Sequence, residues 1–302
     1  MRPRQISLNS VSGSATAVVD DIKSVITGRL TLATGVPITT TDQTAKSTLY
    51  FTPYHGDKIG LYTGSVWDVY TFSELSKAIS GLTTGVNYDV FAYASGTSVV
   101  IDSFVAWTDN TTRATALTTQ DGVYVKDGAP TRRYLGTFRT TAPTTTEDSD
   151  LNRLVWNACN RAQRRLRVQE TTDTWTYSTN TWRSANNSDA NRVTMVVGLA
   201  ESFLNLLVNQ ISYNTVGNNT HLGIGRDATD TLASGVIGVY GYDGGVSQGT
   251  TVITTLKEVV PLGFHFYQWI EKSGITAGTT TWVGDAGDSS SCQFGMIGTV
   301  SA

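Results

Sequence analysis

Short runs of alternating apolar and polar residues, each followed by turn-forming residues, recur along most of this chain. In residues 48–54, 58–63 and 67–72, aromatic and aliphatic side chains alternate with polar ones, and glycine-containing turns separate the three runs. Turn signals about 8–12 residues apart are typical of antiparallel β-sandwiches and barrels. We therefore expect a mainly β protein. Further runs of this kind cover residues 88–93, 98–105, 122–125, 134–138, 193–199, 203–211, 222–225, 236–242, 250–256, 263–270, 280–283 and 293–300.

The composition favours strands over long helices. Charged residues make up only 16% of the 302 residues, and the chain contains 29 Gly, 13 Tyr and 7 Trp. Aromatic side chains fit a pleated sheet and glycine fits its turns, whereas coiled coils need abundant Ala, Glu, Lys and Leu. With 39% hydrophobic residues and a net charge of only −3, the chain is also not expected to be disordered.

One segment departs from the strand pattern and predicts a helix over residues 150–168. Its apolar side chains recur at the spacing of a 3.6-residue turn, carboxylates stand at its start, and arginines fill its last turns, as the helix dipole favours. Before it, the threonine-rich residues 140–146 include Pro143, which cannot continue a central strand and indicates a linker. The apolar stripe consists of Leu151, Leu154, Val155, Ala158, Ala162 and Leu166.

These features divide the chain into four parts. We expect an N-terminal arm over residues 1–28, an antiparallel β-sandwich over 29–141, a linker and one amphipathic connecting helix over 142–170, and a C-terminal jelly-roll-like β-sandwich over 171–302. The arm is polar and rich in Ser, Thr and Asn, so we expect it to dock on a neighbouring chain. The expected fold is thus two β-sandwich domains joined by a helix.

Positive charge is concentrated in the middle of the chain. Residues 113–167 carry 10 Lys or Arg against 5 Asp or Glu, whereas residues 168–302 carry 5 against 11. A basic segment inside an acidic protein does not supply the broad basic surface that nucleic-acid binding needs, so no nucleic-acid partner is expected. Arg161, Arg164 and Arg165 are instead candidates for a solvated helix face or for contact with acidic side chains of a neighbouring subunit.

The sequence does not predict membrane insertion or secretion. No apolar run approaches the roughly 20 residues that span a bilayer, and residues 5–16 are too polar for the apolar part of a signal peptide. We therefore expect synthesis in the cytoplasm without a signal peptide and no membrane partner. Cys159 and Cys292 lie far apart without metal-ligand spacing, so two free thiols are expected.

Residues with catalytic potential do not form a known motif. The chain has three histidines and no His-Glu-x-x-His sequence, and no Gly-x-Ser-x-Gly nucleophile elbow with its strand–turn–helix context is expected. His265 follows the alternation of its segment, which favours a hydrogen-bonded sheet histidine, and Gly223 to Asp227 lacks the third glycine of a phosphate loop. Three loop aspartates leave glycoside hydrolysis and calcium binding open as alternatives: Asp243, Asp285 and Asp288. The main prediction is no catalytic residue, no cofactor and no metal site.

Tryptophans provide a further candidate surface. They could stack on sugar rings if exposed, although packing in a sandwich interior explains most of them equally well. Trp282 is kept with the three arginines as a candidate interaction residue, because neighbouring subunits can cover aromatic side chains at the rim of a sandwich. The tryptophans considered are Trp107, Trp175, Trp182, Trp269 and Trp282.

Several segments from about residue 28 onward carry a resemblance to a known family. They are Gly28-Arg29-Leu30-Thr31-Leu32 through Val36-Pro37, Tyr50-Phe51-Thr52-Pro53-Tyr54 with Gly60-Leu61-Tyr62, Asp121-Gly122-Val123-Tyr124-Val125, Arg132 to Arg139, Trp156-Asn157 with Asn160-Arg161, Pro261-Leu262-Gly263-Phe264-His265 with Trp269-Ile270-Glu271, and Thr281-Trp282-Val283-Gly284-Asp285. Together they resemble virion-associated proteins of tailed bacteriophages. The resemblance covers most of the chain and carries over no catalytic residue.

The resemblance implies a virion structural protein. We expect a fibre or spike subunit on head or tail, attached through its N-terminal part, with the C-terminal domain outward. A capsid-decorating protein that cements shell subunits and a glycan-degrading tail component are the alternatives. The expected partners are further copies of the chain in a homotrimer and other virion proteins of head, collar or tail. A host-surface glycan is the additional partner that such a position allows.

Overall fold

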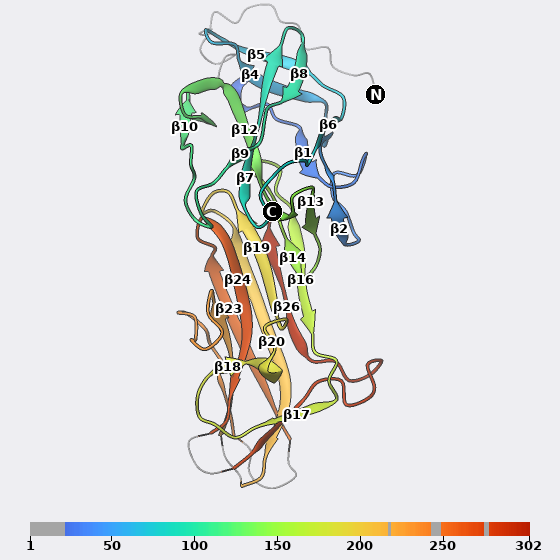
Figure 1. The fold of residues 1–302 in the computed structure, drawn as a ribbon, viewed down its shortest axis with the longest axis vertical. Helices are drawn as coiled ribbons and strands as arrows, with labels where there is room; N and C mark the ends of the chain where they lie inside the picture. The colour runs from blue at the N-terminus through green and yellow to red at the C-terminus, as the bar shows by residue number, and fades with distance from the viewer. Residues whose placement is uncertain (1–21, 217–218, 243–248, 275–277) are drawn as a thin grey trace, which may run out of the picture.

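The computed structural model is mainly β, as the sequence predicts. It describes residues 22–216, 219–242, 249–274 and 278–302. The molecule is elongated, with the N-terminal strands at one end and the long strands of the second half at the other (Figure 1). Most of the predicted arm lies outside the described residues, and its described part includes a helical turn at residues 22–24.

Short strands in the first half of the chain form the N-terminal end of the molecule. They are β1 (Gly28–Thr31), β2 (Gln43–Lys46), β3 (Thr48–Pro53), β4 (Lys58–Tyr62), β5 (Trp67–Thr71), β6 (Leu75–Ala78), β7 (Asn87–Ser95), β8 (Ser98–Ile101), β9 (Val105–Ala106), β10 (Leu117–Gln120), β11 (Val123–Lys126) and β12 (Ala129–Ala142). Strand β3 pairs antiparallel with β1 and β6, β4 pairs with β5, and β7 pairs with β8, β9 and β12. Buried side chains of these strands, among them Leu49, Phe51 and Phe138, share one hydrophobic cluster, whereas Phe91 of β7 and Tyr134 of β12 belong to the hydrophobic cluster of the second half.

Three short strands connect this end to the rest of the molecule: β13 (Thr145–Asp148), β14 (Asn152–Arg153) and β15 (Val155–Asn157). Strand β12 pairs with both β13 and β15. Strand β14 pairs in parallel with β19 (Arg192–Val197). Through these contacts one hydrogen-bonded sheet continues from the N-terminal end into the second half of the chain.

The second half contributes long strands. They are β16 (Gln163–Gln169), β17 (Thr174–Tyr177), β18 (Arg183–Ser184), β20 (Phe203–Asn214), β21 (Asn219–Arg226), β22 (Tyr240–Tyr242), β23 (Thr250–Val259), β24 (Gly263–Lys272), β25 (Thr280–Val283) and β26 (Gly295–Ser301), with the 3-10 turn η1 (Ala185–Asn187). Strand β24 lies between β19 and β21. Strands β16, β26, β20, β25 and β17 form a separate sheet in that order, with β23 paired to β20. We call this the β20 sheet.

Buried residues of the β20 sheet and of strands β19, β21 and β24 share a second hydrophobic cluster. Leu206 of β20 and Trp269 of β24 are both fully buried in it. The two clusters of the molecule meet at β15, where Val155 belongs to the first and Trp156 to the second. Burial alternates along β16 and β20, whereas β1, β7 and β19 are buried along most of their length.

The helix predicted over residues 150–168 is wrong, because this segment contains strands β14, β15 and β16. Asn160 has a φ of 53°, in the left-handed region, which interrupts any helix through this point. Strand β16 pairs with β26 along its whole length, from Gln163 with Ser301 to Gln169 with Gly295. Leu166 fits both the helical and the two-residue spacing, and the long-range pairing with β26 decides between them.

Two local predictions also change. Residues 140–146 are not a linker but a hairpin, in which Thr140 pairs with Thr146 across a turn that contains Pro143. The alternation of residues 175–179, answered by Trp182 across Thr179 and Asn180, predicts a hairpin, but Trp175 and Trp182 do not face each other across one. Trp175 pairs with Trp282 on β25, so the short strand that contains it joins the β20 sheet instead of folding back on its sequence neighbour.

Candidate interaction face on the β20 sheet

One face of the β20 sheet lines the second hydrophobic cluster, and the other face is turned outward. Along β16 the burial alternates, so that Leu166 and Val168 are buried while Arg165 and Arg167 are exposed. The strand register places Arg167, Ile297 and Leu207 in one row across β16, β26 and β20. Outward side chains from neighbouring strands therefore lie next to one another on this face.

The outward face combines apolar and cationic side chains. Phe203 is 68% exposed, Ile253 50%, Ile297 49% and Val259 43%. The cations on outward positions are Arg165, Arg167 and Lys257. No Asp or Glu occupies an outward position on the described strands of this sheet. Because soluble monomers rarely expose grouped apolar side chains, such a face is typical of an interaction surface.

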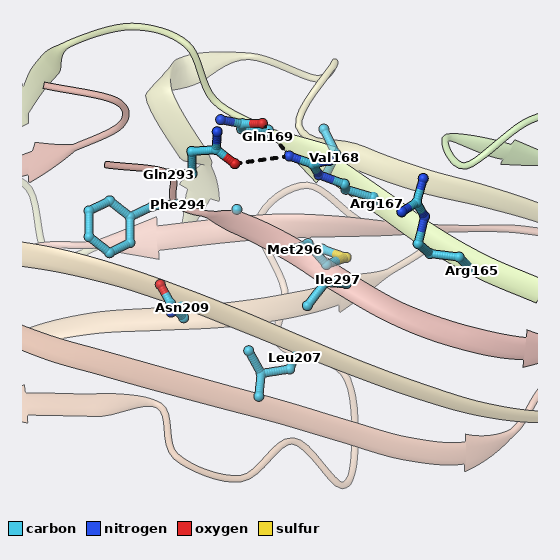
Figure 2. Close-up of a pocket in the computed structure, with 11 residues that line it drawn as sticks. Arg165, Arg167, Val168, Gln169, Leu207, Asn209, Gln293, Phe294, Met296 and Ile297 are labelled. Carbon is cyan, nitrogen blue, oxygen red and sulfur yellow. Dashed lines mark hydrogen bonds between the residues drawn. The ribbon is translucent and has the colours of Figure 1, made fainter. Parts of the chain in front are cut away.

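A depression of about 360 Å³ lies in this face. Figure 2 shows Arg165 and Arg167 on one side of it, Leu207 and Asn209 on the other, and Ile297 between them. Gln293 and Phe294, which directly precede β26, lie at one end of the depression (Figure 2). The full lining is Arg165, Arg167, Val168, Gln169, Leu207, Asn209, Gln293, Phe294, Gly295, Met296 and Ile297.

Hydrogen bonds fix the position of Arg167 at this depression. Its Nη2 donates to Gln169 Oε1 at 2.7 Å and to Gln293 Oε1 at 3.1 Å, as the dashed lines in Figure 2 show. Both partners are neutral amides, and no carboxylate of the described residues lies within ion-pair distance of Arg167. Across the depression, Asn209 Oδ1 is buried and has no hydrogen-bond partner among the described residues. The depression therefore contains a positioned, uncompensated guanidinium and an unsatisfied amide.

The three arginines predicted as interaction residues lie in different environments. Arg165 is on the outward face, where its side chain is 59% exposed and pairs with Asp150. Arg161 donates to Glu201 at 2.9 Å with a side chain 24% exposed. Arg164 is buried, with hydrogen bonds to the Thr39 carbonyl oxygen and to Asp148. Arg164 is therefore part of the interior, and a contact of its guanidinium with a neighbouring subunit would require this network to open.

Trp282 is fully buried in the second cluster, which corrects its placement at a sandwich rim. Trp107, Trp175 and Trp269 are also buried, so interior packing explains these side chains. Trp182 differs, because it is only half-buried. Its ring centre lies 5.0 Å from the Lys272 Nζ and 6.2 Å from the centre of the His221 ring.

His265 is a hydrogen-bonded sheet histidine, as predicted. Its Nδ1 lies 2.7 Å from Asp227 Oδ2, and its Nε2 lies 3.3 Å from the Leu262 carbonyl oxygen. Although burial acts to raise the pKa of Asp227, hydrogen bonds from His265 and from the Phe266 N–H hold that pKa below its usual value. Asp227 directly follows β21 and Leu262 directly precedes β24, so the imidazole ring links the ends of these two strands.

The loop aspartates have structural contacts. Asp288 accepts hydrogen bonds from Ser290 and Ser291, which lower the pKa of its carboxyl to about 2. Asp285 accepts from the backbone N–H of Gly287, and Asp243 lies outside the described residues. Within the described ranges, no group of three or more His, Cys, Asp or Glu side chains is arranged to hold a metal ion.

Two further properties can be read from the described part of the chain. Cys159 and Cys292 are free thiols, as predicted, and burial raises the pKa of the Cys159 thiol. None of the helical segments in the ranges that the structure covers is long and apolar enough to cross a membrane.

The residues of the depression were only partly accessible to sequence reasoning. Arg165 and Arg167 stood out as part of the arginine-rich segment, but the helix prediction assigned them to the wrong element. Asn209 and Gln293 carry no motif, because their proximity depends on the pairing of β20 with β26. The available signal was the pattern of residues 163–169, in which every second side chain from Gln163 is polar and Leu166 and Val168 lie between them, although Arg164 interrupts the alternation.

No protein-family model and no curated protein matches the chain. Solved structures that match include the insecticidal delta-endotoxin Cry8Ea1 from Bacillus thuringiensis, with 7% identity, 92% of this chain and 52% of the endotoxin covered, and a TM-score of 0.24. The infectious bursal disease virus Gx strain matches with 12% identity, 87% and 72% coverage and a TM-score of 0.25. A Bacillus thuringiensis Cry1Da tryptic core variant matches with 6% identity, 85% and 48% coverage and a TM-score of 0.20. The chain thus spans about half the length of the Cry8Ea1 endotoxin, and scores at this level assign it neither a family nor a function.

Proposed function

We propose that this chain is a structural protein of a bacteriophage particle, a fibre or spike subunit whose role is binding and assembly. The observation that carries the proposal is the outward face of the β20 sheet, which exposes grouped apolar and cationic side chains and has no Asp or Glu at the outward positions of its described strands. A face of this kind is typical of a protein that binds other molecules through its surface. The segments that resemble tailed-phage virion proteins support the same role.

The elongated form of the molecule suggests how such a subunit is oriented. In this proposal the N-terminal end attaches to other virion proteins of head, collar or tail, and the end that carries the β20 sheet points outward to the host surface (Figure 1). We also propose that the β20 sheet and strands β19, β21 and β24 are the two layers of a jelly-roll-like sandwich. Their shared hydrophobic cluster supports that arrangement.

A homotrimer is part of the proposal. The contact between copies is placed at the end of the β20 sheet nearest to the N-terminal strands, where Phe203 and Val259 are cross-strand neighbours and both exposed. Glu201 lies two positions before Phe203 and accepts a hydrogen bond from Arg161. An exposed aromatic side chain with an apolar neighbour and polar groups at its edge has the composition of a subunit interface.

Antibody labelling of purified particles tests the virion role. An antibody raised against the recombinant chain should label particles of the phage that encodes it at regular positions on head or tail. Particles should retain the protein through density-gradient purification. The proposal fails if the chain stays in the soluble lysate and the purified particles lack it.

A further inference from the structure

The depression of the β20 sheet has the general form of a small-ligand site. Its volume of about 360 Å³ lies in the range of ligand pockets, which combine apolar walls with a few placed polar groups. Here Leu207, Ile297 and Phe294 supply apolar surface, and the polar side chains come from β16, β20 and the start of β26. A ligand with both an apolar face and several polar groups matches this lining.

The charge of the depression selects an anion. Arg167 is held by two amide oxygens at Nη2, so its Nε and Nη1 donors remain available. Arg165 lies on the same face of β16, but its guanidinium forms an ion pair with Asp150. Both bidentate forks of a guanidinium use Nη2, so a carboxylate here accepts a single charge-assisted hydrogen bond from Arg167.

The amide side chains restrict the ligand further. Gln169, Asn209 and Gln293 each carry one acceptor and one donor group. Sugar hydroxyls both donate and accept, so they match such amides better than a ligand that only accepts, such as a simple carboxylate. Asn209 Oδ1 is itself shielded from solvent, so Asn209 meets a ring hydroxyl through the part of its side chain that lines the depression.

From this geometry we propose that the depression binds a carboxylate-bearing sugar residue, such as a uronic acid unit of a surface polysaccharide. Arg167 takes the carboxylate, and Asn209 with the two glutamines takes ring hydroxyls. The C–H face of the sugar lies against the apolar side chains. This inference rests on the proposed function and deepens it, because it names the class of host-surface molecule that the chain contacts. Sugar binding is nevertheless measured on the isolated chain, so the two proposals can fail separately.

Calorimetry with the full recombinant chain tests the site. The probes are glucuronic and galacturonic acid, the matched neutral sugars glucose and galactose, and acetate as an anion without a ring. We expect each uronic acid to bind about tenfold or more tightly than its neutral counterpart, the effect of one charge-assisted hydrogen bond. Acetate should bind more weakly than either uronic acid.

Matched variants locate the binding. Arg167→Gln should weaken uronic acid binding about tenfold or more and leave neutral-sugar binding unchanged. Arg192→Gln is the control, because Arg192 is half-buried on β19 and stacks on Phe266 at 4.9 Å, away from the depression. Its uronic acid affinity should equal that of the unmodified protein. Thermal melting of both variants verifies that they are folded.

Several results would overturn the proposal. They are the absence of uronic acid binding, equal affinity for uronic acids and neutral sugars, acetate affinity equal to that of the uronic acids, and equal losses in the two arginine variants. Loss of binding in Trp182→Ala with retention in Arg167→Gln would place the sugar on the half-buried Trp182 instead. If particles carry the protein but no uronic acid binds, only this inference fails.

Discussion

A buried ion pair links the two ends of this molecule. Asp89 on β7 and Arg113 form an ion pair of 2.7 Å, with side chains 0% and 9% exposed. Arg113 Nη2 also donates to the Gly198 carbonyl oxygen at 2.6 Å, just after β19. Burial raises the pKa of Asp89, and the charge of Arg113 opposes that effect. The pair therefore links the N-terminal strands to the second half of the chain at the cost of desolvating two charges.

Removing the charge of Asp89 should destabilise the fold strongly. Asp89→Asn leaves Arg113 buried without a counter-ion, so we expect a loss of about 3–5 kcal/mol in the free energy of unfolding. The control is Asp102→Asn, because Asp102 pairs with Arg132 at 3.4 Å with both side chains partly exposed. That variant should lose at most about 1 kcal/mol. Equal losses in urea denaturation of the two variants would contradict the role of the buried pair.

Glu271 should make stability depend on pH. Burial raises the pKa of this carboxyl to about 7, although hydrogen bonds from Trp175 and Arg183 act in the opposite direction. The folded state therefore keeps a proton that the unfolded state releases above about pH 4.5. The resulting contribution to stability is present below that pH and is lost as the pH rises toward about 7.

Glu271→Gln removes this titration. The stability of the variant relative to the unmodified protein should rise by about 1 kcal/mol per pH unit between pH 5 and 7. Denaturation curves at several pH values measure the difference. Asn205→Ala, at an exposed position of β20, changes no titratable group and is the control, so it should follow the unmodified protein in parallel. Parallel curves for Glu271→Gln as well would show that its carboxyl titrates alike in the folded and unfolded states.

At the scale of elements, the segment between the two hydrophobic clusters shows what sequence alone can predict. The strand segments follow from their two-residue alternation, and β20 covers the predicted residues 203–211 although such an apolar run also fits a helix. Residues 150–168 fit a helix in spacing and in end charges, yet they form strands because β12, β19 and β26 supply partners far away in sequence. The proximity of Asn209 and Gln293 depends on distant strand pairing in the same way, so no local sequence pattern predicts it.

Leu154 tests the segment that replaces the expected helix. It lies between β14 and β15 and is 4% exposed, so Leu154→Ala should cost about 2–5 kcal/mol of unfolding free energy. Leu151 belongs to the same predicted stripe but is 39% exposed. Leu151→Ala should change the free energy by no more than about 0.5 kcal/mol. Similar losses in both variants would mean that the two side chains share one buried face, as a helix would require.

At the scale of the whole molecule, the proposed trimer predicts a mass and a contact. Light scattering of the full chain should give about three times 32.5 kDa. Phe203→Asp places a charge in the proposed contact and should yield the single-chain mass with an unchanged melting temperature at low concentration. Ile253→Asp, farther along the same outward face, is the control and should leave the mass unchanged. A mass of 32.5 kDa for the unmodified chain, together with single isolated copies on the particle, would exclude the trimer.

The contact at Phe203 and the depression around Asn209 are compatible within one assembly. Leu207, the lining residue of β20 nearest to Phe203, is four positions away from it, which corresponds to about 13 Å along a strand. Copies can therefore associate near the N-terminal strands while the depression stays open. The outward face then serves assembly at one end and surface contact further along.

An electron-microscopy map of the phage particle tests the central proposal most directly, because it shows the position and the orientation of the chain together. Fitting the structure should place three copies at a regular station on head or tail. Their N-terminal strands should lie against the particle, with the depression of the β20 sheet facing solvent. A map without density for the chain, or one in which the depression lies against the particle and the N-terminal strands point outward, would contradict it.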